Sequence, residues 1–156
     1  YTRFWEGATL INQVRGEWFN AVSTLFAFCN SAPEVREKVD TFQQTLIRLA
    51  SMLYCSALQQ VCVLDDNNLE IIEIVGMDQD SMSYMQLSND RCEVLLQWIQ
   101  RLIVEAQEET TIKIAPPLLT RAFQEFSRGI VNLNNARKIK DIPFPFPYAQ
   151  MITCML

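Results

Sequence analysis

The sequence predicts an all-α fold in which long amphipathic helices pack in a bundle. Apolar residues recur every three to four positions in each long segment, and no segment shows the sustained alternation of a strand. The 156 residues include only 4 Gly and 6 Pro, too few for a turn-rich β-sandwich, and 49% of them are hydrophobic. We therefore expect residues 1–156 to form a single helical region with a substantial core.

The first two helices are predicted from their apolar faces and a start signal. One helix is expected from about Tyr1 to Phe28. Its face holds Ala8, Ile11, Val14, Trp18, Val22, Leu25 and Phe28. A capping box, with Ser31 as N-cap, Pro33 in the first turn and Glu34 three residues on, starts the next helix. Its face holds Val35, Val39, Phe42, Leu46, Leu49, Leu53, Ala57 and Val61. The second half of this helix is apolar on nearly every face, so we expect burial on several sides.

The middle of the chain is less regular. We expect a turn at 64–68, a short helix at 69–75 and a short helix with loops at 78–87. Ser88 or Asn89 is expected to cap a fourth helix. The inner face of that helix is predicted to hold Val94, Leu95, Trp98, Leu102 and Ala106. Residues 108–111 are expected to end it.

A last long helix is predicted to start at Pro116 and Pro117, because Pro is favoured in the first helical turn. Its inner face is expected to hold Leu118, Ala122, Phe126, Ile130 and Leu133. The Pro-rich run at 142–147 must stop it, because each Pro lacks a donor and restricts the residue before it.

Composition argues against several functions. The chain has no His, which removes His-based catalysis and ordinary His-containing zinc sites. The net charge of −5 and the pI of 4.7 disfavour nucleic acid as a partner. The 5 Cys form no C-x-x-C pair and suit reduced thiols, with Cys55 and Cys62 expected on one helix face. Phosphate-binding and nucleophile-elbow motifs are also missing, so we expect neither a catalytic residue nor a cofactor.

Acidic residues gather at three places, and each has a plain structural interpretation. Glu70 with Glu73, and Glu105 with Glu108, are three apart and read as solvated helix faces. The run at 65–68 lacks the spaced ligands, central Gly and final Glu of a calcium loop, so a turn between helices is favoured. We therefore expect no metal site.

Two stretches differ from ordinary helical sequence. Residues 1–7 are aromatic and basic, which suits a membrane–water boundary or a packed aromatic patch. The Pro-rich turns at 114–121 and 142–151 suit a chain approaching a bilayer, or an ordinary surface turn. Because the chain starts without Met and ends inside an apolar stretch, we expect a piece of a longer protein with partial membrane helices at both termini. No uncharged run reaches the roughly 18–20 residues that a spanning helix needs.

These stretches resemble the bestrophins, pentameric anion channels of the plasma membrane and organelles. Residues 1–7 resemble the block after the family's second membrane helix, with a basic residue followed by paired aromatics. Residues 116–119, with Gln124 and Glu125, resemble its cytosolic aperture helix. Residues 142–150 resemble the entry to its third membrane helix. Order and spacing match over nearly the whole chain, but 64–90 match poorly.

The resemblance implies a region on the cytosolic or stromal side of a plasma or organellar membrane, plastids included, between the second and third membrane helices. It implies a homopentamer that conducts chloride or bicarbonate, with calcium acting only through segments outside this chain. It places the pore aperture at Pro116, Pro117 and Leu118. It places contacts with membrane lipid at Tyr1, Arg3, Phe4, Trp5, Phe144, Phe146 and Tyr148.

A mechanism follows from this alignment. The helix that starts at Pro116 would point its unpaired N–H groups and its dipole at the pore axis and favour an anion there. Pro117 stands where the family usually has a flexible aliphatic residue, which alters the aperture's width. Glu108 and Glu109 are expected to face solvent. The alternative function is a soluble all-α interaction domain that buries Trp18 and Trp98 against partner helices.

Overall fold

The computed structural model describes residues 2–62, 78–142 and 146–155, and its regular secondary structure there is helical. The bounds are α1 (Thr2–Ala27), η1 (Pro33–Val35), α2 (Arg36–Val61), α3 (Gln79–Leu87), α4 (Arg91–Glu108), α5 (Pro116–Asp141) and α6 (Phe146–Met155). Within these residues, the β-type pairing consists of one isolated antiparallel bridge, between Cys29 and Ile112. The predicted all-α bundle is therefore confirmed.

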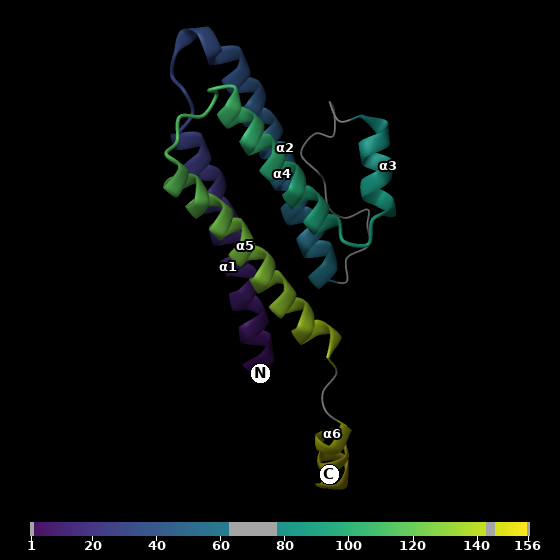
Figure 1. Ribbon diagram of the computed structural model, residues 1–156. Coiled ribbons are helices and arrows are strands. Elements are labelled where there is room, and N and C mark those ends of the chain that lie inside the picture. Colours follow the sequence, from purple (N-terminus) through teal and green to yellow (C-terminus); the bar gives the residue numbers. More distant parts are fainter. Residues whose placement is uncertain (1, 63–77, 143–145, 156) are drawn as a thin grey trace.

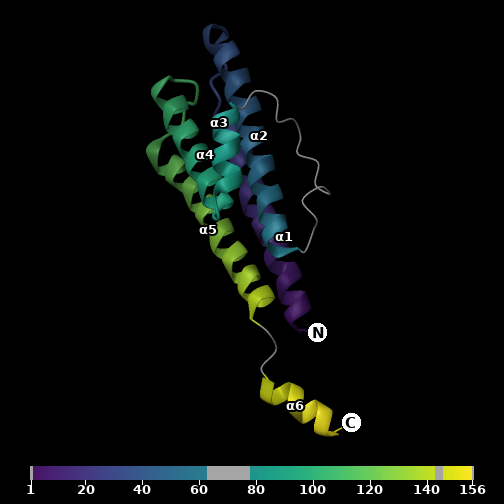
Figure 2. The same cartoon turned by 90° about the vertical axis from the view of Figure 1, so that its right-hand side faces the viewer.

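Two antiparallel helix pairs make up the bundle, as Figures 1 and 2 show. α1 runs beside α5 over most of its length, and α2 runs beside α4. Among the described residues, α3 packs against α4, and α6 lies beyond the end of α5 and makes no contact with the other helices. The two ends of α5 therefore lie at opposite ends of the α1–α5 pair.

The core lies between the two pairs and is built from one face of each long helix. The largest fully buried side chains are Val14, Leu25, Leu46, Met52, Leu53, Leu95, Ile99, Ile103, Phe126 and Leu133. Burying an aliphatic or aromatic side chain of this size stabilises the fold by about 1.5–3 kcal/mol. The consecutive buried run from Cys55 to Ala57 confirms that the second half of α2 is covered on several sides.

Trp18 fixes the closest approach of α1 and α5. Its indole is only 4% exposed, and its Nε1 donates to the Phe126 carbonyl oxygen at 3.3 Å. Opposite the ring lies Gly129, where a Cβ atom would come within 2.0 Å of that same nitrogen. The ring of Tyr54 in α2 packs edge-on against the Trp18 ring, with the two ring centroids 6.4 Å apart. The prediction that Trp18 is a core residue is confirmed.

The start of the second helix differs from the predicted capping box. Ala32, not Ser31, precedes the first turn, which is a 3-10 turn at 33–35, and no side chain caps it. The Asn30 side-chain oxygen instead accepts from the Ala32 N–H at 3.1 Å. Asn30, which directly precedes the predicted capping box, therefore stabilises this turn. The α-helix α2 begins after it, at Arg36.

The fourth helix also begins later than predicted, and its face is rotated. Its N-cap is Asp90 rather than Ser88 or Asn89. The fully buried positions are Leu95, Ile99 and Ile103, with Cys92 and Ala106 at either end of the same face. Val94, Trp98 and Leu102 are only half-buried beside that face. Trp98 therefore packs against the edge of the core and is not fully buried within it, because adjacent apolar residues on α4 fit two neighbouring helix faces.

The remaining predictions in this region have mixed outcomes. α3 forms where a short helix was expected, with Asp78 as its N-cap. Cys62 lies just past the end of α2 in extended backbone and is exposed, whereas Cys55 is buried, so the shared helix face is wrong. The predicted turn at 64–68, the short helix at 69–75 and the Glu70–Glu73 pair lie outside the described residues.

Candidate functional site

The start of α5 forms an exposed tip at one end of the α1–α5 pair (Figure 1). The helix begins at Pro116, as predicted, after Ala115 in extended conformation. Pro116 and Pro117 are both exposed. Leu118 is 41% exposed, while Leu119 is 8% exposed and packs in the core. The inner face of α5 therefore begins at Leu119, and the prediction that Leu118 lies on it is wrong.

This tip offers fewer hydrogen-bond donors than a typical helix N-terminus. Pro116 and Pro117 have no backbone N–H. The N–H groups of Leu118 and Leu119 both donate to the Ala115 carbonyl oxygen, at 2.9 and 3.1 Å. The expectation of several unpaired N–H groups at this position is therefore wrong. The positive end of the helix dipole and an apolar surface remain.

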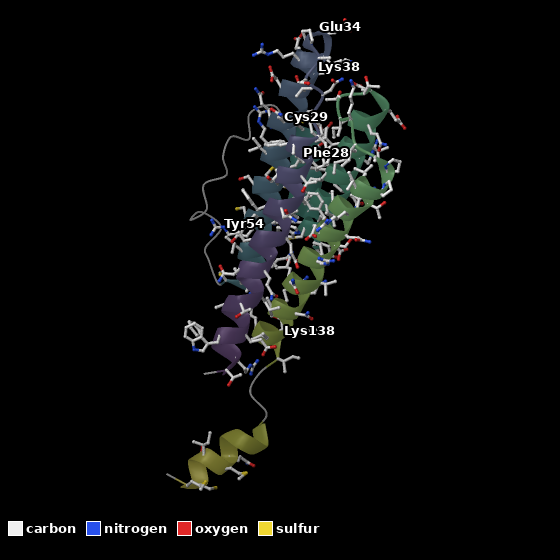
Figure 3. The ribbon with its side chains drawn as sticks, turned by 90° about the vertical axis from the view of Figure 1, so that its left-hand side faces the viewer. Phe28, Cys29, Glu34, Lys38, Tyr54 and Lys138 are labelled. Atoms are coloured by element: carbon white, nitrogen blue, oxygen red, sulfur yellow. The ribbon has the colours of Figure 1, made fainter. Side chains whose placement is uncertain are left out.

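The loop before α5 is pinned to the end of α1. Backbone N–H groups of Asn30 and Lys113 donate across the gap to Thr111 and Phe28 carbonyl oxygens, both at 2.9 Å. Thr110 takes a left-handed conformation with φ of 60°, which turns the chain sharply after α4. Phe28 and Cys29 lie at this junction in Figure 3. These two backbone hydrogen bonds therefore fix the loop that leads into α5 to the residues that follow α1.

Carboxylates near this end face solvent. Glu105, Glu108 and Glu109 are all exposed, as expected for solvated faces. An exposed ion pair joins Glu109 to Lys38 of α2 at 3.1 Å. A groove of about 340 Å³ opens here between α2 and α4, with an apolar floor and a mixed-charge rim.

The opposite end of the bundle carries the aromatic and basic cluster. Phe4 and Trp5 are 72% and 55% exposed, with their rings edge-on at 5.9 Å. These two rings do not form the packed core patch that was the alternative interpretation. Arg3 instead reaches α5, where its guanidinium donates to the carbonyl oxygens of Ile139 and Ile142. Arg3 thus ties the start of α1 to the end of α5.

The α6 helix extends from this same end, and its described side chains are exposed (Figure 1). Phe146 and Tyr148 lie within α6, whereas Tyr1 and Phe144 lie outside the described residues. Met151, Ile152 and Met155 give α6 an apolar surface. Among the described helices, none combines the length and the apolar character that crossing a bilayer requires.

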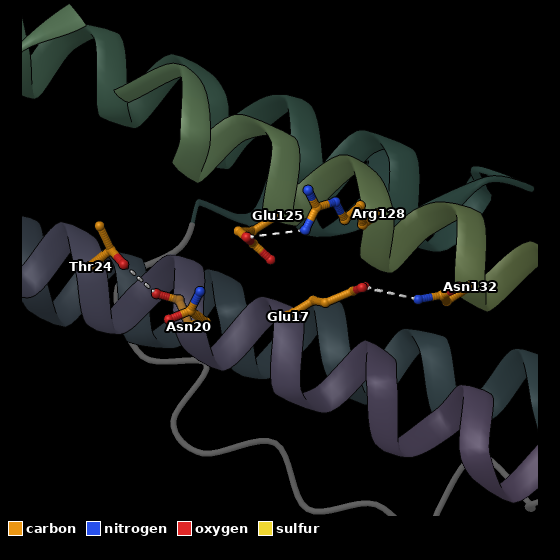
Figure 4. Close-up of polar contacts among 6 residues, drawn as sticks. All are labelled: Glu17, Asn20, Thr24, Glu125, Arg128 and Asn132. Atoms are coloured by element: carbon orange, nitrogen blue, oxygen red, sulfur yellow. Dashed lines mark hydrogen bonds and ion pairs between the residues drawn. The ribbon is translucent and has the colours of Figure 1, made fainter. Parts of the chain in front are cut away.

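A polar seam between α1 and α5 was missed by sequence reasoning (Figure 4). Asn132 donates to both carboxylate oxygens of Glu17, at 3.1 and 3.0 Å. Glu125 is buried on the same side of α5 and pairs with Arg128 at 3.4 Å. The sequence offered one signal of this seam, because Glu125 directly precedes Phe126, a residue of the predicted inner face.

Reactive and metal-binding chemistry has little support here. Burial raises the pKa of the Cys92 thiol to about 12, which makes this sulfur a poor nucleophile. Burial likewise raises the pKa of Cys29 and of Cys55. Across residues 2–62, 78–142 and 146–155, no three acidic or thiol side chains gather where they could hold a metal ion.

Together these features define an elongated all-α bundle whose α1–α5 pair has the proline-started tip of α5 at one end and an exposed aromatic and basic cluster at the other. The family model described as "Bacterial/Fungal Bestrophin protein" matches residues 1–156. The chain therefore belongs to the bestrophins, a membrane-associated family of anion channels. No curated protein and no solved structure matches it.

Proposed function

We propose that this chain is the cytosolic vestibule and aperture region of an anion-channel subunit, with Pro116, Pro117 and Leu118 at the aperture. The family match supports a channel. The observation that carries the proposal further is the separation of the two sites. The exposed aromatic cluster and α6 lie at one end of the α1–α5 pair, and the proline tip lies at the other.

α5 is the element that connects these ends. Its 26 residues span about 39 Å at 1.5 Å per residue. Arg3 holds the last turn of α5 to α1. The Thr111 carbonyl oxygen accepts from the Asn30 N–H, which holds the loop before α5 to the end of α1. A membrane surface at the aromatic end would leave the proline tip projecting into the cytosol or stroma.

The chemistry of the tip suggests how it would treat ions. Five copies around an axis would present five positive helix-dipole ends, which favour an anion without basic side chains. Because the prolines supply no N–H groups, the ring cannot replace the water that a passing ion sheds. Large, weakly hydrated anions should therefore pass more easily than small, strongly hydrated ones.

The partners follow from the same proposal. The chain would assemble as a homopentamer with chloride or bicarbonate as the permeant ion. Arg3, Phe4 and Trp5, with Phe146 and Tyr148 of α6, would meet the lipid interface. Calcium would act only through other segments of the subunit. The alternative function, a soluble interaction domain, would bury Trp18 against a partner helix. Trp18 does not support it, because α5 and Tyr54 of the same chain already cover that ring.

Reconstitution of the full-length subunit in planar bilayers tests this function. Under a potassium chloride gradient, the reversal potential should follow the chloride equilibrium potential rather than that of potassium. A reversal potential that follows the cation gradient, or an absence of current from well-folded protein, would contradict the proposal. Glu108→Gln is a suitable control, because this exposed carboxylate should lie outside the pore and leave selectivity unchanged.

A further inference from the structure

One buried side-chain atom has no hydrogen-bond partner in the part of the chain that the structure describes. It is the Oε1 atom of Gln60, in the last turn of α2. A carbonyl oxygen that is removed from water without gaining a donor is unfavourable. Buried polar side chains in native proteins are therefore almost always paired, either with protein or with ordered water. Gln60 Oε1 thus needs a donor that the described residues do not supply.

Gln60 lines a small cavity where α2, α4 and α5 meet. Cys92 and Leu133, which also line it, are buried in the core, so the cavity lies at the inner edge of this junction. The space open to the centre of a water molecule there is about 10 Å³. One water needs roughly 10–15 Å³ on this measure, so the cavity suits a single water and is too small for a larger ligand.

The cavity wall also carries the polar groups that an internal water requires. Asn134 and Arg137 of α5 bring N–H donors, and Asp90 and Glu93 at the start of α4 bring carboxylate acceptors. The Asp90 side chain does not cap α4, so its oxygens are not used in the first turn of that helix. A buried water typically makes about three hydrogen bonds, and this wall offers partners of both kinds.

We propose that one water molecule binds in this cavity and joins the end of α2 to α4 and α5. The water donates one hydrogen to Gln60 Oε1 and the other to a carboxylate of Asp90 or Glu93. Its oxygen accepts from an N–H group of Asn134 or Arg137. The buried acceptor and the size of the cavity are separate observations, and both point to this occupant.

The water bridge reinforces a direct contact at the same place. Lys140, in the last turn of α5, donates from Nζ to the Gln60 backbone carbonyl oxygen at 2.7 Å. Gln60 is therefore held to α5 twice, by Lys140 directly and by Asn134 or Arg137 through the water. Together these bonds fix the end of α2 against the part of α5 that leads to α6. The bridge lies within one chain, so it does not depend on the channel function.

A structure of the full-length protein, at a resolution that shows ordered water, tests this site. A density peak should lie about 2.5–3.0 Å from Gln60 Oε1 and within hydrogen-bond distance of a second group in the cavity wall. The absence of a peak there, or a protein donor in its place, would overturn the proposal. The wild-type protein alone decides this test, so it holds even if a substitution prevents folding.

Gln60→Met adds a test in solution, because it keeps an unbranched side chain of similar length and removes the acceptor. Magnetic relaxation dispersion of water oxygen-17 detects internal waters that exchange slowly. The Gln60→Met variant should hold one such water fewer per chain than wild type. Gln59→Met is the matched control, because Gln59 does not line the cavity, and it should retain the wild-type number. An unchanged number in Gln60→Met would contradict the bridge.

Discussion

Gly129 shows how one residue sets the spacing of two helices. Its missing side chain leaves room for the Trp18 indole, which reaches past it to the Phe126 carbonyl oxygen. The sequence marked Trp18 as buried, but the contribution of Gly129 was not visible, because a Gly inside a helix gives no sign of what faces it. The same holds for Glu17 and Asn132, whose pairing depends on the register between α1 and α5.

Gly129→Ala should destabilise the protein by about 1–3 kcal/mol, because the new methyl group would overlap the indole ring. Chemical denaturation followed by Trp fluorescence measures this change. Gly16→Ala is the matched control, since a Cβ there meets nothing within 4 Å. It should raise stability by about 0.5–1 kcal/mol through helix propensity. If both variants were equally stable, the close contact at Gly129 would not exist.

Trp18→Ala should cost about 3–5 kcal/mol, because the ring is buried and hydrogen-bonded. Trp98→Ala should cost clearly less, because that ring is only half-buried. Urea midpoints of the two variants measure the difference. A larger loss for Trp98 than for Trp18 would contradict the observed rotation of α4.

At the scale of elements, the pattern of apolar residues was sufficient for most of the fold. Each long helix was expected, and α5 begins at the predicted proline pair. Capping was harder, because Ser31 and Asn30 are both able to organise the turn before Pro33, and the tertiary contact of Asn30 with Thr110 favours Asn30. The face of α4 was also ambiguous, since adjacent apolar positions fit the same period. The tip of α5 was found from sequence, but its lack of donors needed the backbone geometry.

The α3 helix should respond to acid through its cap. Hydrogen bonds from the Ser81 side chain and backbone lower the pKa of the Asp78 carboxyl below 3.8. The cap is therefore fully formed above that value and is lost as pH falls through the lowered one. Exchange protection of α3 amides should fall in this window. Asp78→Asn should keep the cap without the pH response, and an identical acid response in Asp78→Asn would exclude Asp78 as its cause.

At the scale of the whole molecule, the proposed channel function depends on which surface would face the pore axis. The α1–α5 pair carries exposed aromatic residues at one end and the proline tip at the other, with the hydrogen bonds from Asn132 to Glu17 between them. Nothing in a single chain's sequence states which of its surfaces meets a neighbouring copy. The aperture therefore rests on the family resemblance together with the exposure of Pro116, Pro117 and Leu118.

The most direct test of the proposed aperture is the anion permeability ratio of Pro117 variants of the full-length protein in bilayers. Wild type should favour large, weakly hydrated anions over chloride. Pro117→Ala should weaken that preference by restoring a donor and widening the ring, and Pro117→Glu should reduce anion current sharply. If both variants assemble and leave the ratios and the current unchanged, the start of α5 does not line the aperture.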